Sequence, residues 1–135
     1  MILKPRFAIL ALFVFFVAGC ATVSNIGKTP EEIVAARSTA RWQAIIGNDW
    51  KTAYQYTTPA FRETLPQEQY QGFIGATVIR KSAEAVKVKC EEATACDVTV
   101  RMAHEPVMIR VGEIVSNFPE RWVEVDGEWY IYHRR

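Results

Sequence analysis

The spacing of apolar residues divides this chain into three parts. Residues 7–17 are apolar without interruption, residues 29–75 place apolar side chains at helical spacing, and residues 84–133 largely alternate between apolar and polar. A helix repeats every 3.6 residues and a strand every two, so the second part predicts helices and the third part predicts strands. The sequence therefore predicts a small α+β domain that follows an apolar leader.

Three helices joined by short turns are expected in the first half of the domain. The Thr-Pro-Glu-Glu sequence at residues 29–32 forms a capping box with proline at the first helical position, and predicts a long helix over residues 30–46. Shorter helices are expected over residues 50–56 and 66–73, with one extra turn capped by Thr58 between them. The long helix is apolar on two opposite sides, which is typical of a helix between two layers.

A β-hairpin is expected at the C-terminal end of the chain. Asp126-Gly127 separates two apolar segments and suits a type I′ turn. This turn places Trp122 opposite Ile131 and Val123 opposite Tyr130. Residues 114–118 are expected to form a preceding strand, and Pro119 indicates a sheet edge or a bulge.

The apolar leader has the features of a secretory signal peptide. Lys4 and Arg6 precede the apolar run, and small residues follow it. The run is too short for a membrane span, which needs about 20 apolar residues. Residues 17–20, Val-Ala-Gly-Cys, resemble the lipobox of bacterial lipoprotein precursors. An ordinary secreted protein with a cysteine there by chance is the alternative.

The lipobox resemblance implies a specific maturation and location. The chain would be cleaved before Cys20, its sulfur would carry diacylglycerol, and the new N-terminus would be acylated with a chain such as palmitate. Ala21 in place of aspartate implies the outer membrane of the cell envelope, facing the periplasm. The expected divisions are a signal peptide over 1–19, the lipidated cysteine and tether over 20–28, and the domain over 29–135. A tether of this length spans roughly 16 Å.

The other two cysteines are expected to form a disulfide. With Cys20 assigned to lipid, Cys90 and Cys96 are left in an oxidising compartment and allow one bridge. Cys90 lies near the end of one alternating segment and Cys96 begins the next, so a bridge between them also sets the register of a hairpin. The expected pairs are Val88 with Val98, Val86 with Val100, and Lys89 with Asp97.

The arrangement of elements resembles the nuclear transport factor 2-like superfamily, whose fold is shared with ketosteroid isomerases, scytalone dehydratases and polyketide cyclases. The matching segments are Arg41-Trp42, residues 47–50, Ala53-Tyr54 and residues 122–131. The resemblance implies three N-terminal helices packed on a curved antiparallel sheet of about four strands. It also implies a cone with an apolar pocket. The expected pocket-lining residues are Trp42, Tyr54, Phe73, Trp122 and Trp129.

No set of residues predicts catalysis, a metal site or a cofactor. Glu113, Asp97 and His104 are carboxylate or imidazole candidates, but each is expected to face solvent. Glycine-rich phosphate loops, nucleophile elbows and metal-ligand spacings are absent from the sequence. The 16 basic and 15 acidic residues nearly balance, which argues against nucleic-acid binding.

The sequence favours a non-enzymatic, lipid-anchored periplasmic domain that binds a ligand or another protein. Its partners would be the membrane, through lipid on Cys20, and either an envelope protein or a hydrophobic small molecule. The alternative is a small isomerase-like or dehydratase-like enzyme acting on a hydrophobic molecule in the cone pocket. A homodimer through the sheet face that carries Tyr130 and Tyr132 is compatible with either function.

Overall fold

The computed structural model describes residues 25–134. The leader, the cleavage site and Cys20 lie outside the described residues, so secretion and lipidation remain predictions. None of the described helices combines the length and the apolar character that a membrane crossing needs.

Four helices precede the sheet, not the three that the sequence predicts. They are α1 (Pro30–Ile46), α2 (Trp50–Gln55), α3 (Pro59–Arg62) and α4 (Gln67–Ile74). The expected capping box is confirmed, because the Thr29 and Glu32 side chains each accept a hydrogen bond from the other residue's backbone N–H. The turn capped by Thr58 is long enough to count as α3. Pro66 was expected to be the first residue of this helix. It is the N-cap of α4 instead, so the helix begins one residue later, at Gln67.

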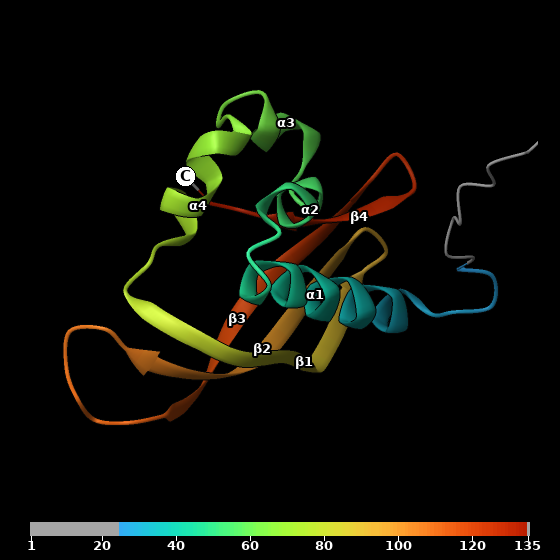
Figure 1. Ribbon diagram of the computed structural model, residues 1–135. Helices are drawn as coiled ribbons and strands as arrows, with labels where there is room; N and C mark the ends of the chain where they lie inside the picture. Colours follow the sequence, from blue (N-terminus) through green and yellow to red (C-terminus); the bar gives the residue numbers. More distant parts are fainter. Residues whose placement is uncertain (1–24, 135) are drawn as a thin grey trace, which may run out of the picture.

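The sheet is a single antiparallel meander. Its strands β1 (Val78–Glu92), β2 (Ala95–Pro106), β3 (Ile114–Val125) and β4 (Glu128–Tyr132) lie in chain order. Figure 1 shows α1 lying across one face of this sheet, while α2, α3 and α4 gather beside the C-terminal end of β4. Three helices packed on a curved sheet around a cone were expected, and this expectation is wrong. The later helices have only six, four and eight residues, so α1, with 17, is the helix that covers the sheet.

The hairpin of β1 and β2 has the expected disulfide, between Cys90 and Cys96. Val88 pairs with Val98 and Lys89 with Asp97, as expected. Val86 was expected opposite Val100, but Ala85 takes that position because the register shifts between Ala85 and Lys87. Similar shifts follow Arg80 and Lys89, so β1 is interrupted three times. Such bulges bend a strand and disrupt its ladder locally.

The C-terminal hairpin has the expected register. Trp122 pairs with Ile131 and Val123 with Tyr130. Asp126 and Gly127 have φ values of 52° and 82°, as a type I′ turn requires. Pro119 was expected at an edge or a bulge, and the edge is confirmed: Pro119 pairs with Thr99 on one side and has no strand on its other side within the described residues. This position is tolerated because β4 ends opposite Arg121, which leaves the other side of Pro119 without a strand.

The core lies between α1 and the sheet and extends toward α4. It is rich in aromatic side chains, which pack mainly edge to face, and it also encloses four polar residues. The buried apolar residues include Val34, Trp42, Ile45, Tyr54, Phe61, Tyr70, Val98, Val100, Met102, Trp122, Trp129 and Ile131. The enclosed polar residues are Ser38, Arg41, Thr57 and Glu120.

Candidate functional site beside the end of strand β4

A buried carboxylate joins α1 to β3. Glu120 accepts four hydrogen bonds, two at each oxygen. Oε1 accepts from Arg41 Nη1 at 3.0 Å and from Trp42 Nε1 at 2.7 Å. Oε2 accepts from Ser38 Oγ at 2.7 Å and from Trp122 Nε1 at 2.9 Å. The Arg41 side chain is only 1% exposed and that of Glu120 only 5%, so this is a dry ion pair.

The remaining donors of Arg41 extend the network toward the C-terminus. Its Nε and Nη2 atoms donate to the Tyr70 hydroxyl at 3.0 and 2.9 Å. That hydroxyl lies 3.5 Å from Nε2 of His133. Burial, and secondarily the charge of Arg41, lower the pKa of His133 to about 4. Burial also raises the pKa of Tyr70. At neutral pH the His133 ring is therefore uncharged and the Tyr70 hydroxyl keeps its proton.

This network is suited to holding the fold together. Each Glu120 oxygen already has two donors, so the carboxylate has no obvious position from which to take a proton from a substrate. A fully satisfied buried network rigidifies a core and fixes the relative position of its elements. Here it fixes α1 and α4 against β3.

Two hollows open beside this network, at the point where β4 leaves β3. The smaller has a volume of about 270 Å³ and lies against α1 and α4. The larger has a volume of about 710 Å³ and lies against the outer face of the sheet. They share Pro119, Glu120, Arg121 and Tyr132. The smaller is further lined by Arg41, Trp42, Phe73, Ile74, Phe118, Ile131 and His133.

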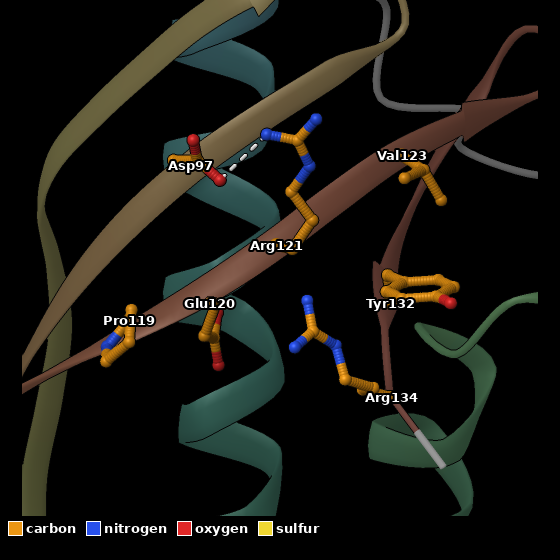
Figure 2. A pocket seen from close by; sticks show the side chains of 7 residues that line it. All are labelled: Asp97, Pro119, Glu120, Arg121, Val123, Tyr132 and Arg134. Carbon is orange, nitrogen blue, oxygen red and sulfur yellow. Dashed lines mark hydrogen bonds and ion pairs between the residues drawn. The ribbon is translucent and has the colours of Figure 1, made fainter.

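Figure 2 shows the side chains around the larger hollow. Arg121 is turned toward Asp97, to which it donates at 2.9 Å, and it also donates to Glu92 at 3.0 Å. The Arg134 guanidinium projects beside Glu120 and the Tyr132 ring. No ion pair joins Arg134 to a carboxylate among the described residues. The hollow is therefore open, partly aromatic, and has one cation available for a ligand.

The segment that links β2 to β3, together with the start of β3, exposes a group of apolar side chains. Five of them are between 57 and 86% exposed. They are Val107, Met108, Ile109, Val111 and Val115. Exposed apolar residues are common singly, but a contiguous group marks an interaction surface. The last of the group, Val115, lies in β3, three residues before Phe118, which lines the smaller hollow.

The residues predicted to line a pocket divide into two groups. Trp42 and Phe73 line the smaller hollow, and Phe73 is half exposed there. Tyr54, Trp122 and Trp129 are buried in the core, because the interior that was expected to be a cone is filled by packed rings.

Of the three polar candidates, Asp97 and Glu113 face solvent as expected. His104 does not: it lies in β2, and its Nε2 is 3.0 Å from Ser116 Oγ. Its Nδ1 is buried without a hydrogen-bond partner within residues 25–134. Within the same residues, no group of three or more His, Cys, Asp or Glu side chains is arranged to hold a metal ion.

Sequence reasoning missed the central pair, since Arg41 was named only within the Arg41-Trp42 segment of the family resemblance and Glu120 was not singled out. One signal was present. Glu120 shares a strand face with Trp122, which is buried in the core, and with Phe118, which packs against the core; each is two positions away. A carboxylate at such a position needs a buried partner.

No family model matches the chain, and no curated protein matches it. Among solved structures, it is similar to the solution structure of a SEC-C motif containing protein from Rhodopseudomonas palustris. The TM-score is 0.58 over 73% of each chain, with 13% sequence identity. This similarity shows a shared fold and nothing finer.

The comparison corrects the family resemblance inferred from the sequence. The similarity found is to a SEC-C motif protein, so assignment to the nuclear transport factor 2-like superfamily is wrong. The misassignment arose because short helices before an antiparallel sheet, with a Trp-rich final hairpin, do not distinguish the two architectures. The resemblance to the bacterial lipoprotein family likewise finds no support in the comparisons.

Proposed function

We propose that this chain is a non-enzymatic protein-interaction domain of the cell envelope, held at the membrane by lipid on Cys20. The observation that carries the proposal is the exposed apolar segment between β2 and β3, in which Met108 is 86% exposed. Burying apolar surface is favourable by about 25 cal/mol per Å². Exposed apolar surface of this extent is therefore expected to be covered by a partner.

The position of the apolar segment favours a protein partner over the anchoring bilayer. In Figure 1 the first described residues enter α1 at one end of the domain, and the β2–β3 connection extends from the opposite end. With 17 residues, α1 alone spans about 25 Å. A domain tethered at its N-terminus by a short segment would therefore direct this connection away from the membrane surface.

Two further features support an envelope location and a binding role. The Cys90–Cys96 disulfide suits an oxidising compartment, which agrees with the signal-like leader. The buried carboxylate that an isomerase-like enzyme would need is fully occupied by four donors at Glu120. Binding is therefore better supported than chemistry.

The interaction can be tested in intact cells with the full chain. A photo-crosslinking amino acid at Met108 is expected to capture an envelope protein, whereas the same probe at the exposed Lys51 of α2 is not. Ile109→Asp should reduce the crosslink formed at position 108, because it places a charge in the contact. Equal crosslinking at both positions, or none at position 108, would refute the proposed function.

Membrane attachment needs a separate test. Cys20→Ser is expected to move the chain from the membrane fraction to the soluble fraction and to abolish incorporation of labelled palmitate. Retention of the label in this variant would exclude Cys20 as the lipid site.

A further inference from the structure

The outer edge of β3 is only partly covered by β4. The two strands pair from Val125 with Glu128 as far as Arg121 with Tyr132, and β3 extends to Ile114. Over Ile114–Glu120, β3 therefore has β2 on one side and no strand on the other within the described residues. The two hollows lie at the start of this uncovered edge.

The hairpin geometry shows which backbone groups face the open side. In a hairpin with a two-residue turn, the residues that flank the turn exchange both backbone hydrogen bonds. Val125 therefore directs its N–H and C=O toward β4, and alternate residues back along β3 do the same. The residues between them direct their N–H and C=O toward β2, as the 2.8 Å hydrogen bond from the Glu124 N–H to the Thr94 carbonyl shows. Val115 and Asn117 thus present both polar groups at the open edge, while Pro119 presents only its carbonyl.

The hollows lie on the two faces of the vacant strand position. The smaller, with Trp42 and Phe73, faces α1 and α4, and the larger, with Arg134, faces outward. Successive side chains of a strand point to opposite faces. A strand added here would direct one side chain into the apolar hollow and the next toward the arginine.

We propose that the β3 edge at Val115–Pro119 binds an extended segment of a partner protein as an added strand. That segment would carry an apolar side chain for the Trp42 and Phe73 hollow and, next to it, an acidic side chain for Arg134. This inference rests on the proposed interaction function and names its partner class. Main-chain hydrogen bonds supply affinity in this mode of recognition, and pockets for alternate side chains supply specificity.

Charge and edge chemistry favour this occupant over a second copy. The β3 edge of a second copy, Ile114–Pro119, contains no acidic residue to meet Arg134. The other edge of the sheet is less suitable, because β1 is interrupted by three register shifts. Its Ala85 N–H also already donates to Thr39 Oγ1 at 3.0 Å.

The test uses the full chain in detergent micelles and a phage-displayed library of short random peptides. Enriched peptides are expected to carry adjacent apolar and acidic residues, and to slow hydrogen exchange at the amides of Val115 and Asn117. Asn117→Pro should weaken their binding by about tenfold or more, because it removes a main-chain donor and constrains the edge. Asn117→Ser keeps the N–H and is the matched control, so its binding should match wild type. Arg134→Glu should reverse the preference for an acidic residue.

Asn117→Pro is expected to fold, since its N–H faces the open side, and thermal melting checks this. If the variant unfolds, N-methylation of the peptides replaces it. Methylating an amide that faces β3 should abolish binding, and methylating the next amide should not.

Peptides that bind Asn117→Pro as tightly as wild type would overturn the inference, as would a library without enriched peptides. A wild-type dimer that Asn117→Pro converts to a monomer would assign the edge to a second copy instead. In all three cases, a surviving crosslink at position 108 would leave the proposed function standing.

Discussion

Replacing Glu120 with glutamine tests whether the buried network holds α1 against β3. The substitution keeps the shape of the side chain and removes its charge. A glutamine amide has one acceptor oxygen, so it can satisfy the donors at one former carboxylate oxygen but not those at the other. If its oxygen stays with Arg41 and Trp42, its NH₂ group faces the Ser38 hydroxyl and the Trp122 N–H.

The cost follows from what is left unpaired. Ser38 can rotate its hydroxyl and accept, but the Trp122 N–H cannot, so one buried donor loses its partner. More importantly, Arg41 keeps its charge at 1% exposure without a counter-charge. Breaking a buried ion pair by removing one partner typically costs about 3–5 kcal/mol. Because small domains are stable by roughly 5–15 kcal/mol, this is a large fraction of the total.

Urea denaturation followed by tryptophan fluorescence measures the change, since Trp42 and Trp122 both bind this carboxylate. The matched control is Glu128→Gln, which removes the exposed partner of Arg37 at 3.0 Å and should cost less than about 1 kcal/mol. If Glu120→Gln costs no more than this control, the network does not stabilise the fold as argued.

Three further predictions concern pH, the disulfide and the first helix cap. The folded pKa of His133 is lowered from 6.5 to about 4, so the domain should lose up to about 3 kcal/mol as pH falls through this range. Urea titrations should show that His133→Phe removes much of this dependence, and an unchanged slope would contradict it. Reducing Cys90–Cys96 should lower the free energy of unfolding by on the order of 2–3 kcal/mol, and an unchanged melting temperature in reductant would exclude this. Thr29→Ala should cost about 1 kcal/mol by removing the cap of α1, whereas Thr29→Ser should cost little; equal losses would contradict a capping role.

Local features of this fold could be predicted from the sequence because their causes are local. The capping box at Thr29 and the turn at Asp126-Gly127 depend on backbone groups within a few residues of each other. The register between Val88 and Val98 follows from the alternation of two short segments joined by a disulfide.

Features that depend on distant segments could not be predicted. Arg41 and Glu120 are 79 residues apart, and nothing near either residue identifies its partner. The shift after Ala85 depends on how β1 bends beneath α1, so Val86 could not be placed. The candidate site shows the same limit. It exists because β4 ends at Tyr132, opposite Arg121, while β3 extends back to Ile114. The sequence of one strand does not show how far its neighbour extends beside it.

The interrupted strand β1 has a consequence for assembly. A sheet that accepts strands at both edges can add copies head to tail without limit, which leads to fibres. Here one edge is broken by three shifts and bears lysines such as Lys87 and Lys89, while the other offers only the short stretch that ends at Pro119. Strand addition to this domain would therefore stop after one partner, giving a complex of fixed stoichiometry.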